Sequence, residues 1–351
     1  MFQPQNQALT VDDSGTQLTF FDTGPPSRNN YTTLVAVHGI IFNNKIFRKL
    51  AAHSFTRGIR VIAINRRGYS ESTPFSVEQK AERASVPPQS TWLHDRGIEI
   101  AKFIDGLIQK EHLPEVSVDA ETGSVTGGVV ILGWSAGASY TNATIACVEH
   151  LEAAIQSRLG THLRGNIVYD APSIALGKPL PAKTYWHELD TFIPPVARIP
   201  SFMQWMTSYF KHNNLASRDP ELLEYVLPGL DRAPSIWNMS TGDIAAMSEE
   251  EIYAVQESPG LISGSLLEPA ARAYETSVFG KQVRQLLPHL QTLVVCGDST
   301  VPYIISAFWA IQEDDKANGG GNVRYQLVPG ANHFMHWDEP EKTLDALLEI
   351  L

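Results

Sequence analysis

Cysteine is scarce in this chain of 351 residues, which has only Cys147 and Cys296. Two cysteines are too few for the disulfide framework that stabilises many small secreted domains. The amino terminus lacks the basic start and apolar stretch of a secretory signal, and the carboxyl-terminal LLEIL is not a peroxisomal address. We therefore expect a reduced, cytoplasmic setting.

Long apolar runs and positive charge are also in short supply. No apolar run approaches the ~18 to 20 residues of a membrane-spanning helix. There are 27 Lys and Arg against 38 Asp and Glu, so the formal net charge is -11. Nucleic-acid binding depends on clustered Lys and Arg. The sequence thus predicts a globular protein that neither spans a membrane nor binds nucleic acid, and it indicates no oligomeric state.

Motifs for cofactor binding are absent as well. The sequence contains no G-x-G-x-x-G at the start of a helix, no phosphate-binding G-x-x-x-x-G-K-[ST] and no H-E-x-x-H. The stretch GWSAGA, which begins at Gly133, has a serine where a dinucleotide fingerprint needs its second glycine. We therefore expect no cofactor.

What the sequence does have is an alternation of short apolar runs with helical patterns. Such alternation predicts a mostly parallel central sheet with helices on both faces, an α/β fold. The expected strands are 17–22, 34–37, 60–68, 127–134, 165–172, 291–298 and 324–330, and the expected helices are 43–58, 90–113, 136–159, 303–316 and 340–351.

The alternation stops after Pro172 and resumes only near residue 288. We interpret 1–172 and 288–351 as one core domain and 173–287 as an inserted helical cap over the carboxyl edge of the sheet, where open α/β sheets bind ligands. Aromatic side chains of this insertion either line a ligand site or form the cap's own core; they are Trp186, Phe192, Phe202, Trp205, Tyr209, Phe210, Trp237 and Tyr253.

Ser135 lies in a G-x-S-x-G pattern between a predicted strand and a predicted helix. A serine raised on so sharp a turn needs a strained backbone, and Gly133 and Gly137 give the clearance that larger side chains would block. The turn also directs the amide of Ala136 toward the place where an oxyanion would form. Ser135 is therefore our candidate nucleophile, because the alternative of a small residue in a tight turn does not explain this setting.

A serine nucleophile needs a base and a residue that orients the base. His333 follows the last predicted strand, late in the chain, and is our candidate base, with His336 as the rival. The pair also forms H-x-x-H, but no third ligand stands at a zinc-like spacing nearby, so we expect no metal. His38, before Gly39, is expected to shape a turn.

Two aspartates compete for the third role. Asp298 follows the predicted strand LVVCG and precedes STVP, and Asp170 follows the predicted strand NIVY and precedes AP. Either carboxylate would lie at the carboxyl edge of the sheet, and either could instead cap a helix or a turn. We favour Asp298 and keep Asp170 as the alternative acid.

These stretches together resemble the α/β-hydrolase fold superfamily. The likeness covers VAVHG, INRRGYSES, LGWSAG, DSTVP and GANHFMHWDEP, and thus most of the chain outside the insertion. It implies that the amides of Ile40 and Ala136 form the oxyanion hole, that His333 is the base and that Asp298 is the acid. One departure keeps Asp170 open, because relatives commonly have two further residues between the positions of Gly297 and Asp298.

A Ser-His-Asp triad predicts acyl transfer through an acyl-enzyme. We expect a carboxylic ester hydrolase acting on a hydrophobic small molecule. A thioesterase, a lactonase and an acyltransferase are alternatives on the same triad, and a ligand receptor of this fold is an alternative outside catalysis. The serine counts against family members that open epoxides with an aspartate nucleophile.

Overall fold

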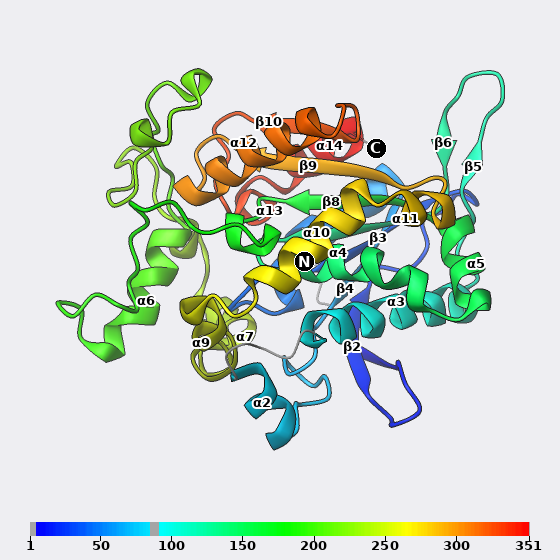
Figure 1. Ribbon diagram of the computed structural model, residues 1–351, viewed down its shortest axis with the longest axis horizontal. Coiled ribbons are helices and arrows are strands. Elements are labelled where there is room, and N and C mark those ends of the chain that lie inside the picture. The colour runs from blue at the N-terminus through cyan, green and yellow to red at the C-terminus, as the bar shows by residue number, and fades with distance from the viewer. Residues whose placement is uncertain (1–4, 85–90, 351) are drawn as a thin grey trace.

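The computed structural model describes residues 5–84 and 91–350. An eight-stranded sheet runs through its centre in the order β1-β2-β4-β3-β7-β8-β9-β10 (Figure 1). β1 and β2, and β2 and β4, pair antiparallel, and every other neighbouring pair is parallel. The strands are β1 (Gln7–Thr10), β2 (Gln17–Asp22), β3 (Thr32–Val37), β4 (Ile59–Ile64), β7 (Val129–Trp134), β8 (Leu163–Tyr169), β9 (Gln291–Gly297) and β10 (Val323–Val328).

The sheet is covered on both faces, as the expected α/β class requires. A hydrophobic core on one face includes residues of α1, α12 and α14, and a second core on the other face includes residues of α3, α4 and α5. Inner strands such as β4 and β7 are buried along their whole length, which explains their uninterrupted apolar sequences. The helices are α1 (Arg48–Ser54), α3 (Trp92–Glu111), α4 (Gly137–Ala146), α5 (Ala153–His162), α12 (Pro302–Ala317) and α14 (Pro340–Ile350).

Most predicted elements are present, with several differences. The short antiparallel pair β5 (Ser117–Val118) and β6 (Val125–Thr126) and the helices α2 (Val77–Ala84) and α13 (Met335–Asp338) were not expected. The helix expected over 43–58 is divided into a 3-10 turn (Asn44–Phe47), α1 and a second 3-10 turn (Phe55–Arg57). The edge strand β1 was not expected, and the helix expected over 136–159 is divided into α4, a 3-10 turn (Cys147–His150) and α5. Leu151 has extended backbone angles, and the side chain of Gln156 binds the carbonyls of Val148 and Glu149 at the end of that turn. The predicted residues Ser90 and Leu351 lie outside the described part of the chain.

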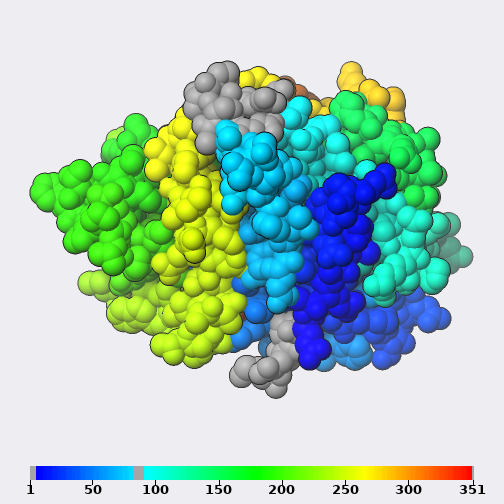
Figure 2. All heavy atoms as spheres, turned by 90° about the horizontal axis from the view of Figure 1, so that it is seen from below, coloured from blue at the N-terminus to red at the C-terminus, as the bar shows by residue number. Residues whose placement is uncertain are grey.

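The segment between β8 and β9 is helical wherever it has regular structure. It contains α6 (Pro195–Met206), α7 (Thr241–Met247), α8 (Glu250–Ile252), a π-helical turn (Tyr253–Glu257), α9 (Ser258–Ser263), α10 (Leu267–Phe279) and α11 (Lys281–Leu286). In Figures 1 and 2 its green-to-yellow part extends from one end of the molecule. α10 packs against α4 in the core layer, so we propose that the cap proper ends near Gly264. No helix among the described residues is long and apolar enough to cross a membrane.

The contact between α3 and α4 depends on Gly97. A Cβ atom at this position would lie 2.5 Å from both the carbonyl carbon and the carbonyl oxygen of Ala143. We expect Gly97→Ala to lower the free energy of unfolding by about 1–3 kcal/mol, because backbone atoms must move to admit the methyl group. Urea denaturation measures this change.

Gly242→Ala is the matched control, because a Cβ at Gly242 in α7 would meet nothing closer than 3.8 Å. This variant is expected to keep or raise the stability, since alanine favours a helix by up to about 1 kcal/mol over glycine. Equal unfolding midpoints for the two variants would contradict the packing argument.

Candidate active site

Ser135 lies on the turn between β7 and α4, where the sequence predicted it. Its φ angle is 56°, in the left-handed region that a non-glycine residue enters only under strain. A Cβ at Gly133 would approach the Cα of Ala138 to 2.5 Å, and one at Gly137 would approach the carbonyl oxygen of Val37 to 2.4 Å. Both glycines therefore have the clearance role that the motif suggests.

His333 is paired with Asp170. The ring Nδ1 of His333 lies 2.6 Å from Oδ2 of Asp170, and both side chains are almost completely buried. The same carboxylate accepts hydrogen bonds from the amide of Gly297 at 2.9 Å and from the hydroxyl of Thr300 at 2.5 Å. Burial of the Cys296 thiol and the negative charge of the nearby Asp170 both raise the pKa of this thiol.

Asp298, the acid that we favoured from the sequence, does not contact His333. Its Oδ1 instead accepts hydrogen bonds from the amide of Gly330 at 2.7 Å and from the hydroxyl of Ser299 at 3.0 Å. Asp298 follows Gly297 directly. Its side chain therefore binds the backbone of the loop that carries His333 and does not contact the imidazole ring. The expectation that Asp298 contacts His333 is thus wrong. Asp170, the alternative, makes this contact.

The other two histidines of interest have structural environments. His336 is buried against Phe47 and Trp134, and burial, followed by the nearby His333, lowers its pKa well below the usual value. His38 accepts a hydrogen bond from the amide of Arg66 at Nε2, and its Nδ1 lies 2.8 Å from the carbonyl of Gly39. Nδ1 therefore carries the proton of a neutral ring, in agreement with the turn-shaping role expected for His38.

A cavity opens beside the serine. Ser135, His333, Ile40 and Ala136 all line it. In the described part of the chain, the amides of Ile40 and Ala136 donate no hydrogen bond to another protein group. No direct hydrogen bond joins Ser135 to His333 in this structure, a looseness common in enzymes without substrate. The candidate nucleophile, the candidate base and two free amides thus share one cavity.

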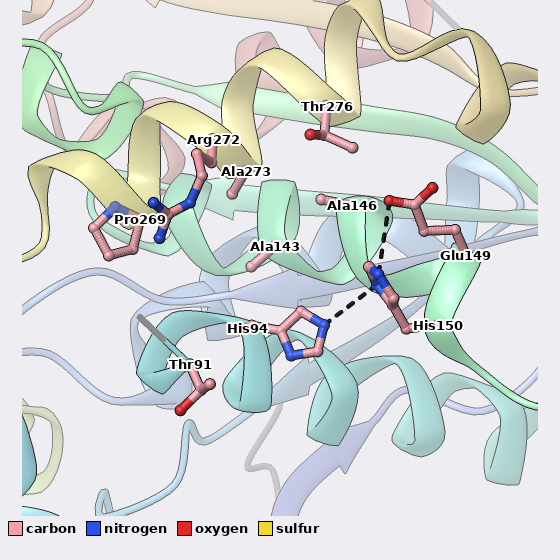
Figure 3. Close-up of a pocket in the computed structure, with 10 residues that line it drawn as sticks. All are labelled: Thr91, His94, Ala143, Ala146, Glu149, His150, Pro269, Arg272, Ala273 and Thr276. Carbon is pink, nitrogen blue, oxygen red and sulfur yellow. Dashed lines mark hydrogen bonds and ion pairs between the residues drawn. The ribbon is translucent and has the colours of Figure 1, made fainter. Parts of the chain in front are cut away.

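The remaining walls come mainly from the segment between β8 and β9. They are largely apolar and aromatic, with Pro172, Ile174, Leu180, Tyr185, Trp186, Phe202, Met206, Tyr253 and Leu261, and α12 adds Tyr303. A larger cleft of about 480 Å³ lies elsewhere, where α3 and α10 face each other with His94, His150 and Arg272 (Figure 3). That cleft contains none of the candidate residues.

Two side chains, those of Trp134 and Arg66, make contacts that the sequence did not reveal and that hold the site in place. The indole nitrogen of Trp134, directly before Ser135, donates a 3.0 Å hydrogen bond to the carbonyl of His333. The guanidinium of Arg66 donates to the carbonyls of His38 and Gly39, just before Ile40, and pairs with the buried Glu257 at 2.8 Å. No local pattern could indicate these pairings, because their partners lie 199 and 191 residues apart.

Among the described residues, no cluster of His, Cys, Asp and Glu could hold a metal ion. His333 and His336 in particular do not converge, because one ring is paired with Asp170 and the other with the hydroxyl of Tyr169.

Residues 34–346 match the model of the alpha/beta hydrolase family. This match spans most of the chain, which therefore belongs to that family. The eight-stranded sheet and its flanking helices agree with this assignment.

Solved structures share the fold at low sequence identity. Epoxide hydrolase A from Mycobacterium thermoresistibile aligns with a TM-score of 0.54 and 15% identity over 99% of this chain and 98% of that one. A bromoperoxidase from Bacillus anthracis aligns with a TM-score of 0.52 and 14% identity over 99% of both chains. An esterase from Exiguobacterium antarcticum aligns with a TM-score of 0.51 and 15% identity over 98% of both chains. No curated protein sequence matches the chain.

The ion pair between Arg66 and Glu257 provides a test of how the site is held. We expect Glu257→Ala to lower the free energy of unfolding by about 3–5 kcal/mol, because it leaves the buried guanidinium without its anion. Thermal and urea denaturation measure this loss. Glu251→Ala, at an exposed position of α8, is the control and should change stability by less than about 0.5 kcal/mol. Equal losses would contradict the role of the pair.

Proposed function

We propose that the protein is a serine hydrolase that cleaves a carboxylic ester of a hydrophobic small molecule through an acyl-enzyme. The observation that carries this proposal is the buried hydrogen bond between His333 and Asp170 beside Ser135. Asp170 fixes the ring so that Nδ1 carries a proton and Nε2 is free to accept one. This is the arrangement in which a histidine activates a serine hydroxyl.

The proposed reaction follows the usual steps of acyl transfer. Nε2 of His333 accepts the proton of Ser135 Oγ while the oxygen attacks the ester carbonyl. The amides of Ile40 and Ala136 donate hydrogen bonds to the oxyanion of the tetrahedral intermediate. His333 then donates its proton to the leaving alcohol, and water, activated by the same nitrogen, hydrolyses the acyl-enzyme. Asp170 stabilises the transient imidazolium with its negative charge.

The cavity supports a hydrophobic substrate, because most of its wall is apolar or aromatic. The nucleophile supports acyl transfer over epoxide opening, since Ser135 occupies the nucleophile position where epoxide-opening members of this family use an aspartate. Thioesters and lactones could react on the same triad by the same steps. We also propose a cytoplasmic location, because both cysteines are free and buried and no disulfide stabilises the described fold.

Labelling of Ser135 tests the proposal. We expect a fluorophosphonate probe to modify the wild-type protein and the protein to hydrolyse short p-nitrophenyl esters. Ser135→Ala should abolish labelling and lower kcat by about 10⁴-fold or more while the fold is kept, since triad residues act as a unit. Intact-protein mass spectrometry, ester hydrolysis and circular dichroism provide the readouts. A wild-type protein that is neither labelled nor active would refute the proposal of a serine hydrolase. The ligand receptor would then be the remaining alternative.

The assignment of the acid rests on a second comparison. Asp170→Asn should lower kcat by about 10³- to 10⁴-fold, because the amide can stabilise neither the required tautomer nor the imidazolium. Asp298→Asn should lower kcat by less than about tenfold, since its carboxylate binds only the loop backbone and Ser299. Hydrolysis of p-nitrophenyl acetate measures both. The reverse ranking would return the role to Asp298.

A further inference from the structure

One carboxylate in the wall of the Ser135 cavity has a buried oxygen without a hydrogen-bond donor. Glu188, in the loop before α6, lines this cavity. Its Oε1 accepts a hydrogen bond from the hydroxyl of Tyr253, but its Oε2 is buried and has no hydrogen-bond partner. A buried carboxylate oxygen without a donor is costly, so such a group in a ligand cavity points to a donor on the ligand.

No neighbouring cation offsets this charge. No ion pair involves Glu188 in the described part of the chain. Burial lowers the pKa of the adjacent His187 to about 4, so this ring is neutral near pH 7. Burial and, after it, the charge of Glu188 raise the pKa of both Tyr253 and Tyr303. The carboxylate therefore acts on the cavity as an uncompensated negative charge.

The aromatic rings around Glu188 suit the same kind of ligand. Tyr185, Trp186, Phe202, Tyr253 and Tyr303 line the cavity, and the rings of Phe202 and Tyr253 are stacked with centroids 6.1 Å apart. The faces of aromatic rings attract cations, and the attraction grows when water is excluded. Among the described residues of this wall, Glu188 is the one acidic group, and no Lys or Arg is present.

We propose that Glu188 determines substrate specificity by binding a protonated amine, so that the preferred substrate is an ester or thioester whose apolar acyl or leaving part carries an ammonium group. The N–H of this ammonium donates to Oε2 of Glu188, and the surrounding rings bind its alkyl groups. This inference rests on the proposed function for its reaction, but the binding of the cation depends on the cavity alone. Tyr253 is a positioning residue, since it acts through its hydrogen bond to Glu188.

The test compares substrates of the same shape with and without the charge. S-[2-(dimethylamino)ethyl] ethanethioate and S-(3-methylbutyl) ethanethioate form one pair, with the amine in the leaving group. p-Nitrophenyl 6-aminohexanoate and p-nitrophenyl heptanoate form the second pair, with the amine in the acyl part. Glu188→Gln keeps the size of the side chain and removes its charge. The ratio of kcat/KM for amine over neutral substrate is compared between variant and wild type, which cancels the intrinsic reactivity of each ester.

We expect this ratio to fall about 10- to 100-fold in Glu188→Gln for at least one pair, the range of a hydrogen bond between charged groups. Glu251→Gln, which removes an exposed carboxylate of the cap, should keep the wild-type ratio. An unchanged ratio for both pairs would overturn the assignment of Glu188. A fall of equal size in Glu251→Gln would overturn it too, because it would reflect the overall charge of the cap.

Binding separates this inference from the proposed function. Calorimetry with Ser135→Ala should show that the dimethylamino thioester binds at least about tenfold more tightly than its neutral partner, and that adding Glu188→Gln removes this difference. If the wild-type protein is labelled by fluorophosphonate but shows no preference for amines, only the role of Glu188 is refuted. If the wild-type protein is not labelled, calorimetry still tests the binding of the amine. Equal affinities for the dimethylamino thioester and its neutral partner would refute the cation site.

Discussion

The buried carboxylate of Asp170 is the group on which the candidate site depends. It accepts hydrogen bonds from the end of β9, from Thr300 ahead of α12 and from the ring of His333. Its own backbone has a φ angle of 47°, and its amide donates to the carbonyl of Val295 in β9. A charge buried this deeply is stable only with such partners. Its place at the junction of β8 and β9 therefore determines where the histidine loop can lie.

The loop before Ile40 depends on a different buried charge. Arg66 follows β4, and its guanidinium binds the carbonyls before Ile40 and the carboxylate of Glu257 in the segment between β8 and β9. Glu249, in the same segment, accepts hydrogen bonds from Ser70 and Asn43. The segment between β8 and β9 is thus bound to the loop that carries the free amide of Ile40 and to the loop after β4, and not only to the ends of its own strands.

Much of this architecture could be predicted from the sequence. The parallel strands have apolar runs because they are buried on both faces, and the serine turn has a recognisable pattern because its glycines must avoid backbone atoms. β1 could not be predicted, because QALT is short and mostly exposed at the sheet edge. The contact partner of His333 was misjudged because Asp170 and Asp298 both directly follow a strand, and only the fold decides which side chain turns toward His333. Glu188 belongs to no motif, and the rings of Phe202, Tyr253 and Tyr303 that surround it with Tyr185 and Trp186 are distant in the chain.

The pairing of Arg66 with Glu257 has an evolutionary consequence. Arg66 binds Glu257 in the segment that we propose as a cap, and it also donates to the carbonyl of Gly39 in the loop of the proposed oxyanion hole. A change that loosened the cap to admit bulkier molecules would also disturb the amides needed for turnover. Selection for a broader range of substrates would therefore meet a cost in rate, and new specificities would arise more readily from exchanges of side chains within the aromatic wall than from changes in the position of the cap.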